Sequence, residues 1–256
     1  MNPPLSKRPG KPATTSQARR SFPEEFLQLA LDLSSLNEAL SLVSKVAQVV
    51  ARVEIGTPLI LSAGLAAVES VRRSMLHPIV VVADVKICDA GERIARSAFA
   101  AGADVVTAVA GVIDDVTWQG VLKAAKAVDH PVGSPSPILL DTVGHGVDLV
   151  VLEKLCATAD REGIPVDLCI HRPKSGSRTF AALIAPFAGG AGYFDRLIVA
   201  GKLSPAEVHD ALTAGFDTLI VGGAVADAAD PLAIWNAFRS NVDSFHQGTS
   251  KNEQSQ

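Results

Sequence analysis

Short apolar runs alternate with helical segments eight times along the chain. The runs are rich in valine, isoleucine and leucine, and each ends at a polar residue or a glycine. Continuous apolar runs of this kind are typical of strands buried on both faces, as in parallel sheets. The runs cover residues 27–32, 49–54, 79–86, 104–107, 138–141, 166–171, 197–201 and 218–222.

The segments between the runs carry the signals of helix ends. Ser35 with Glu38, and Ser204 with Glu207, match the capping box of a helix N-terminus, and Pro205 stands at a first helical position. Helix C-termini are expected at Gly102, Gly163 and Gly215. Eight strand–helix units without a glycine-rich dinucleotide fingerprint predict a single α/β domain, a (β/α)8 TIM barrel.

The two ends of the chain differ from this pattern. Residues 1–23 hold five prolines and five basic residues with no acidic residue, which predicts a disordered basic arm. The arm resembles a transit peptide, although a solvated tail is the favoured interpretation. The barrel is expected over residues 24–242, and residues 243–256 are expected to form a disordered tail.

Composition excludes several classes of protein. With 48% hydrophobic residues and a net charge of −4, the chain is typical of a globular protein. The 23 basic against 27 acidic residues give no positive field for nucleic acid. We expect no membrane span and no secretory signal, because no apolar run is long enough. Three cysteines do not indicate a disulfide framework, so we expect a cytoplasmic protein.

The candidate site follows from the fold. Barrel enzymes build their sites at the C-terminal ends of the strands, so the residues that close the runs are the candidates. They are Asp32, Glu54, Asp84 with Lys86, Thr107, Asp141, His171, Gly201 and Gly222.

The segment from Asp84 to Asp89 is the sharpest feature of the chain. Asp84 and Lys86 are two residues apart in a strand, so both point into the barrel mouth, and Asp89 lies in the loop beyond. A lysine between two carboxylates stays protonated, which favours a fixed cation or proton donor beside a developing carbanion over a Schiff base. The alternative is a structural ion pair at the end of the strand.

Three carboxylates, Asp32, Glu54 and Asp84, close adjacent strands. They would repel one another without a cation among them. Mg²⁺, which binds one or two carboxylates together with water and substrate oxygens, would meet this need. Neutralisation by Lys86 alone is the weaker alternative, since counting Asp89 there are four acids to one lysine.

His171 closes the sixth run and is a candidate general acid or base. His145, near the end of the fifth strand, is a weaker candidate. Arg172, Lys174 and Arg178 make the following loop basic, which fits either an anionic substrate or a solvated loop.

Glycines follow the last two strands. Gly201 precedes Lys202, and Gly222 precedes Gly223, in the loops that commonly bind phosphate in barrels. We therefore expect these four residues to form a phosphate site.

Four segments carry a resemblance to a known family. Residues 29–32, 53–60, 83–91 and 221–224 resemble the orotidine-monophosphate-decarboxylase superfamily, with Asp84, Lys86 and Asp89 matching its Asp-x-Lys-x-x-Asp motif. The nucleotide decarboxylases carry a lysine at the end of strand two, where this chain has Glu54. In this respect the chain is most similar to the 3-hexulose-6-phosphate synthases, on the branch that also holds the 3-keto-L-gulonate-6-phosphate decarboxylases.

The resemblance implies an aldol reaction of ribulose 5-phosphate with formaldehyde through an enediolate. It further implies Mg²⁺ on Glu54 and Asp84, and a homodimer in which Asp89 reaches the partner's site. Lys86 and His171 would share the catalysis. Asp32 and Arg172 would bind the substrate, and the phosphate would lie at the glycine loops.

The chain departs from the synthase pattern in the segment Arg172–Ser175 after strand six, at Lys202, where a glycine is usual, and in the region 187–193. Two alternatives therefore stay open. One is decarboxylation of a 3-keto sugar acid phosphate, and the other is a catalytically silent barrel that binds sugar phosphates.

Overall fold

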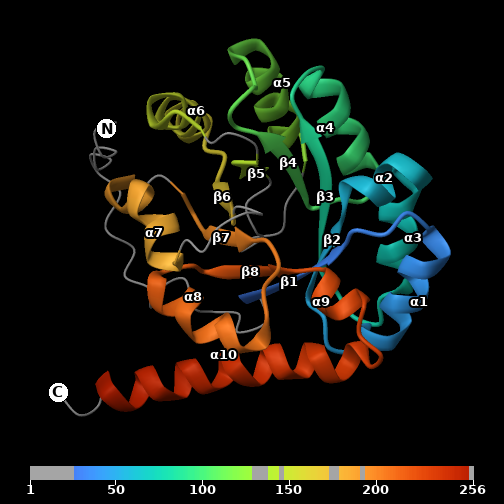
Figure 1. The fold of residues 1–256 in the computed structure, drawn as a ribbon. Coiled ribbons are helices and arrows are strands. Elements are labelled where there is room, and N and C mark those ends of the chain that lie inside the picture. The colour runs from blue at the N-terminus through green and yellow to red at the C-terminus, as the bar shows by residue number, and fades with distance from the viewer. Residues whose placement is uncertain (1–25, 129–137, 144–146, 173–178, 191–193, 254–256) are drawn as a thin grey trace.

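The computed structural model describes residues 26–128, 138–143, 147–172, 179–190 and 194–253. Eight parallel strands close into a barrel in sequence order, with β8 paired to β1 (Figure 1). The predicted TIM barrel is confirmed. The strands are β1 (Leu27–Leu31), β2 (Arg52–Ile55), β3 (Val80–Ile87), β4 (Val105–Val109), β5 (Ile138–Asp141), β6 (Val166–His171), β7 (Leu197–Ala200) and β8 (Thr218–Val221).

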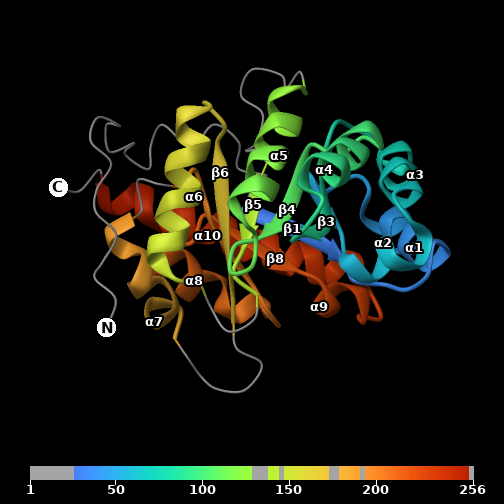
Figure 2. The same cartoon turned by 90° about the horizontal axis from the view of Figure 1, so that it is seen from above.

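Helices surround the barrel in Figure 1, and Figure 2 shows the same barrel and helices turned by 90°. They are α1 (Leu36–Val46), α2 (Thr57–Ala63), α3 (Ala66–Ser74), α4 (Gly91–Ala100), α5 (Asp115–Lys126), α6 (Leu149–Arg161), α7 (Phe180–Ile184), α8 (Val208–Ala214), α9 (Gly223–Ala226) and α10 (Pro231–Glu253). Two 3-10 segments, Ala185–Gly190 and Pro205–Glu207, lie next to α7 and α8. None of the helices in this described part of the chain combines the length and the apolar character that a bilayer crossing requires.

The strands are buried on both faces, as their apolar runs predict. Their outer faces join the main core between barrel and helices. Their inner faces form a small apolar cluster of Val82, Val105, Leu139, Cys169, Ile198 and Ala200. Above this cluster, polar side chains such as Glu54, Asp84 and Asp141 face the mouth of the barrel.

The predicted helix ends are largely confirmed. Ser204 and Glu207 form a reciprocal capping box, and the Ser35 hydroxyl accepts a hydrogen bond from the Glu38 backbone N–H. Gly215 ends α8 with a φ of 103°, in the left-handed region. The second strand, however, begins at Arg52 and not at Val49, because Val49 and Val50 form the turn after α1 through bonds to the Val46 carbonyl.

The prediction of a disordered C-terminal tail is wrong for residues 243–253. These residues continue α10 to Glu253. The apolar face of α10 continues from Val242 to Phe245, whose ring meets His209 edge-on, while His246 packs against Phe26. The predicted basic arm, residues 1–23, lies outside the described residues.

Candidate active site

A cavity of about 1060 Å³ opens at the C-terminal ends of the strands. Every strand-end residue that the sequence predicts for the site lines it: Asp32, Glu54, Asp84, Lys86, Thr107, Asp141, His171, Gly201 and Gly222. Lys202 and Gly223 line the same cavity. The barrel therefore brings together chemistry from all eight strands.

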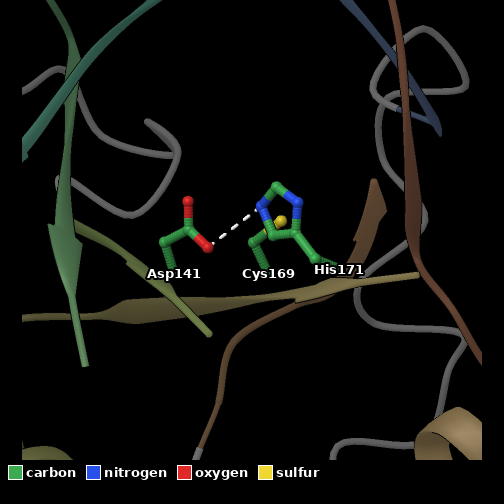
Figure 3. A group of neighbouring side chains, drawn as sticks. All are labelled: Asp141, Cys169 and His171. Carbon is green, nitrogen blue, oxygen red and sulfur yellow. Dashed lines mark ion pairs between the residues drawn. The ribbon is translucent and has the colours of Figure 1, made fainter. Parts of the chain in front are cut away.

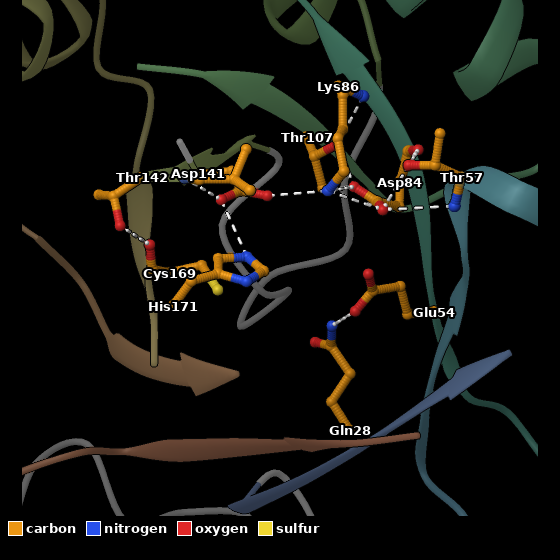
Figure 4. Close-up of polar contacts among 11 residues, drawn as sticks. Gln28, Glu54, Thr57, Asp84, Lys86, Thr107, Asp141, Thr142, Cys169 and His171 are labelled. Atoms are coloured by element: carbon orange, nitrogen blue, oxygen red, sulfur yellow. Dashed lines mark hydrogen bonds and ion pairs between the residues drawn. The ribbon is translucent and has the colours of Figure 1, made fainter. Parts of the chain in front are cut away.

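Lys86 joins two buried carboxylates at the centre of the site (Figure 4). Its Nζ lies 3.0 Å from both oxygens of Asp84 and 2.9 Å from Asp141 Oδ2. Burial lowers the pKa of Lys86, but the charges of Asp84 and Asp141 outweigh it and raise that pKa above its ordinary value. Lys86 is thus a fixed cation, as expected. Its second partner is Asp141 and not Asp89, so that part of the prediction is wrong.

The backbone at Lys86 is irregular. The pairing of β3 with β4 shifts register between Ala83 and Ile87, and Lys86 has a φ of 44° in the left-handed region. Its N–H donates to Thr107 Oγ1 at 2.8 Å. The bulge turns the lysine toward β5, and unfavourable backbone conformations of this kind cluster at functional sites.

Two threonines hold Asp84 from either side. Thr57 Oγ1 lies 2.7 Å from Asp84 Oδ2, and Thr107 Oγ1 donates to Asp84 Oδ1 at 2.8 Å. Thr57 is the residue of this group that sequence reasoning missed. Its position directly after β2, at the start of α2, was the available signal.

Asp141 also pairs with the candidate acid–base residue. His171 Nε2 lies 3.0 Å from Asp141 Oδ1, and the N–H of Val143 donates to the same oxygen at 2.7 Å. Burial raises the pKa of Asp141, but His171 and Lys86 outweigh it and lower that pKa below its ordinary value. A carboxylate beside Nε2 fixes the proton on that nitrogen and leaves Nδ1 as the basic atom. The sequence predicts Asp141 at a strand end, and the structure adds its two partners, Lys86 and His171.

Cys169 stands beside this pair on β6 (Figure 3). One ligand atom each from Asp141, Cys169 and His171 lie within 4.8 Å of one another. Burial and the charge of Asp141 raise the pKa of the Cys169 thiol, so it is neutral at neutral pH. A thiol and an imidazole do not suit Mg²⁺, which prefers oxygen ligands.

Glu54 lies on the opposite side of the cavity and is 7% exposed. It accepts a hydrogen bond from Gln28 Nε2. Burial, Asp84 and Asp32 raise the pKa of Glu54 to about 8. Burial inside the barrel mouth and the charge of Asp84 also raise the pKa of Asp32.

Burial and repulsion between the carboxylates raise both pKa values, and no ion pair in the described part of the chain offsets them. Lys86 is engaged by Asp84 and Asp141, and no cationic side chain of the described residues pairs with Glu54 or Asp32. Among the described residues, this side of the cavity therefore holds no ion-pair partner for its carboxylates. Glu54 and Asp84 offer hard oxygen ligands at this point, so the residues present fit a divalent cation such as Mg²⁺.

Two predicted site residues do not line the cavity. Asp89 is exposed in the loop between β3 and α4. Arg172 pairs with Glu207 at 2.9 Å, and its guanidinium lies 4.9 Å from the centre of the Phe180 ring. The weaker candidates His145, Lys174 and Arg178 lie outside the described residues.

The predicted phosphate residues lie together at the ends of β7 and β8. Gly201 has a φ of 112° and Lys202 a φ of 47°, so both adopt the left-handed conformation. A lysine at such a position is uncommon, which explains why glycine is usual there. Lys202 adds a cation to the cavity that Gly222 and Gly223, at the start of α9, also line.

Comparison with known proteins shows to which family the chain belongs. The model of the orotidine 5'-phosphate decarboxylase / HUMPS family matches residues 25–158. The chain belongs to this family. It is 35% identical over 217 residues to a 3-hexulose-6-phosphate synthase of Mycobacterium gastri, a match that covers 84% of this chain and 99% of that protein.

Solved structures agree with this assignment. A crystal structure of a 3-hexulose-6-phosphate synthase is 32% identical with a TM-score of 0.69, covering 84% of this chain and 98% of that one. A 3-keto-L-gulonate-6-phosphate decarboxylase of Vibrio cholerae is 25% identical with a TM-score of 0.64, covering 87% of this chain and 99% of that one. The solved relatives thus include proteins named for each of the two reactions.

Proposed function

We propose that the protein catalyses the Mg²⁺-dependent aldol condensation of ribulose 5-phosphate with formaldehyde to a 3-hexulose 6-phosphate. The observation that carries this proposal is the position of Glu54 beside the Asp84–Lys86 pair, with no ion-pair partner of its own among the residues that the structure describes. A site with fixed positive charge and a place for a divalent cation can stabilise an enediolate. Similarity to synthases over nearly their whole length supports the choice of substrate.

Each side chain has a role that follows from its contacts. Glu54 and Asp84 would hold Mg²⁺, which when bound stabilises negative charge on the ketone and neighbouring hydroxyl oxygens of the sugar. Lys86, kept protonated by Asp84 and Asp141, stabilises the same charge from the other side.

His171 moves the proton. Its Nδ1 removes a proton from the hydroxymethyl carbon of the sugar, and the resulting carbanion forms a bond to the formaldehyde carbon. The proton then passes to the formaldehyde oxygen, which becomes the new hydroxyl. Asp141 stabilises the imidazolium through its 3.0 Å contact with Nε2.

The substrate is held at both ends of the cavity. Asp32 would bind sugar hydroxyls, and Gly201, Lys202, Gly222 and Gly223 would bind the phosphate, since backbone N–H groups and a lysine suit that anion.

The test is formaldehyde consumption by the purified protein with ribulose 5-phosphate and Mg²⁺. We expect consumption that stops with a chelator and returns with added Mg²⁺. The Lys86→Ala variant is the matched control, and consumption no faster than by that variant would refute the proposal.

Decarboxylation is the second candidate, favoured by the similarity to 3-keto-L-gulonate-6-phosphate decarboxylase. Two basic residues suggested it: Arg172 is engaged by Glu207 and does not line the cavity, and Lys174 lies outside the described residues. Release of CO₂ from a 3-keto sugar acid phosphate, without formaldehyde consumption, would select this reaction. The third alternative, a catalytically silent barrel, would not need Mg²⁺. Binding of Mg²⁺ by wild type that is lost in Glu54→Gln would therefore argue against it.

We also propose a homodimer in which Asp89 completes the partner's site. The exposure of Asp89 outside its own cavity supports this arrangement. We further propose that the protein acts in the cytoplasm.

A further inference from the structure

A column of buried polar side chains descends from Glu54 into the barrel. Gln28 of β1, Arg52 of β2 and Asp167 of β6 are each 0% exposed. Arg52 and Asp167 face each other at 3.6 Å, and Arg52 Nε donates to Gln28 Oε1. Burying a charged pair and an amide is costly, so a specific use for this column is expected.

The orientation of the Gln28 amide follows from the donors around it. An arginine guanidinium has donors and no acceptor, so it fixes the carbonyl oxygen of Gln28 on its own side. The amide nitrogen must then point the other way, where it donates to Glu54 Oε2. Arg52 thus determines that Gln28 presents a donor, and not an acceptor, to Glu54.

Because Gln28 donates to Oε2 of Glu54, the other carboxylate oxygen is available to a ligand in the cavity. Figure 4 shows the Gln28 amide directed at one carboxylate oxygen, while the other lies on the side of Asp84 and Lys86. The Glu54 carboxylate is therefore held with one oxygen anchored below and one directed toward the site. Partners of this kind, which orient a metal ligand from behind, strengthen metal binding.

We propose that Gln28, oriented by Arg52, is a positioning residue that holds Glu54 in the geometry for binding a divalent cation. This inference rests on the proposed metal site of Glu54 and Asp84. It makes metal binding depend also on Gln28 and Arg52, which lie below the cavity and do not line it.

The test measures metal binding and not turnover. Mn²⁺ serves as the probe, with free Mn²⁺ followed by electron paramagnetic resonance in the full-length protein. Gln28→Met keeps the length of the side chain but removes the donor. We expect its Kd for Mn²⁺ to rise about 10- to 100-fold, the usual effect of losing a partner behind a metal ligand. Glu54→Gln shows that the bound ion is at Glu54.

A control separates positioning from general loosening of the barrel. Ile198→Val removes a methyl group from the interior apolar cluster, on β7, a strand that does not pair with the Glu54 strand β2. We expect a lower melting temperature but a Kd for Mn²⁺ within about twofold of wild type. Arg52→Lys keeps a donor-only cation beside Gln28, so it should retain most of the affinity that Arg52→Met loses.

The outcomes are distinct. A folded Gln28→Met variant with wild-type Mn²⁺ affinity overturns the positioning role, whatever reaction the protein catalyses. Weakened binding in Gln28→Met but not in Ile198→Val supports it, even if formaldehyde is not consumed. A wild-type protein that binds no Mn²⁺ refutes the metal site, and this inference with it.

Discussion

Replacement of Glu54 by glutamine should stabilise the metal-free protein. Glu54 is the buried carboxylate of the cavity that lacks a cationic partner among the described residues, and its pKa is raised to about 8 by burial, Asp84 and Asp32. Glutamine has nearly the same shape and cannot ionise. The substitution therefore removes the free-energy cost of keeping this carboxyl group protonated, or charged above its pKa, in the folded state, while the packing of the side chain is kept.

The sign and size of the effect follow from the pKa. Between pH 4.5 and about 8, the unfolded chain has released this proton while the folded protein still holds it, so the free energy of unfolding falls as pH rises. Above pH 8 the raised pKa lowers the free energy of unfolding of wild type by about 5 kcal/mol, because each unit of difference between the folded and unfolded pKa is worth about 1.4 kcal/mol. At pH 7 the cost is about 3 kcal/mol. In Glu54→Gln a weaker hydrogen bond with Gln28 offsets about 1 kcal/mol of the gain in stability.

The assay is urea denaturation in the presence of a chelator, at pH 5 and at pH 8. We expect Glu54→Gln to exceed wild type by a few kcal/mol at pH 8 and by much less at pH 5. Glu69→Gln, an exposed glutamate in α3, is the matched control and should stay within about 0.5 kcal/mol of wild type at both values. Added Mg²⁺ should stabilise wild type and not Glu54→Gln. A variant no more stable than wild type at pH 8 would refute the reasoning.

Three further predictions concern other parts of the molecule. Asp141→Asn should lower kcat for formaldehyde consumption by about 100-fold or more in a folded protein, because His171 loses its carboxylate partner; an unchanged kcat would contradict the role of the pair. Phe245→Ala should lower the free energy of unfolding by about 1 kcal/mol, measured in urea, since its ring packs beside His209 and His246. A mixture of inactive Lys86→Ala and Asp89→Asn chains, refolded together, should recover about a quarter of wild-type activity if each site takes Asp89 from the partner, and no recovery would contradict the shared site.

The barrel could be predicted because its signal is local. A strand buried on both faces must be apolar throughout, and each of the eight runs contains that signature. The same logic misplaced the start of β2, since Val49 and Val50 are apolar for a different reason: they form the turn after α1. The C-terminal error was avoidable, because Phe238, Val242 and Phe245 follow a helical spacing that continues beyond the predicted end.

The composition of the site could also be predicted, but its pairings could not. Strand ends of a closed barrel must converge, so the lining residues follow from the strand assignment alone. Which carboxylate meets Lys86 depends instead on the bulge in β3, and a change of register is invisible in the sequence. Asp141 was therefore named as a strand end while its contact with His171, on the next strand, went unrecognised.

The corrected pairings sharpen the case for a metal ion. The sequence predicts four acidic side chains around one lysine, which is an excess of negative charge with no defined position in the barrel mouth. Lys86 in fact binds Asp84 and Asp141, His171 also contacts Asp141, and Asp89 is outside the cavity. The uncompensated charge is thus confined to Glu54 and Asp32, on one side of Asp84. A divalent cation held by Glu54 and Asp84 would balance the charge that the described side chains leave without an ion-pair partner.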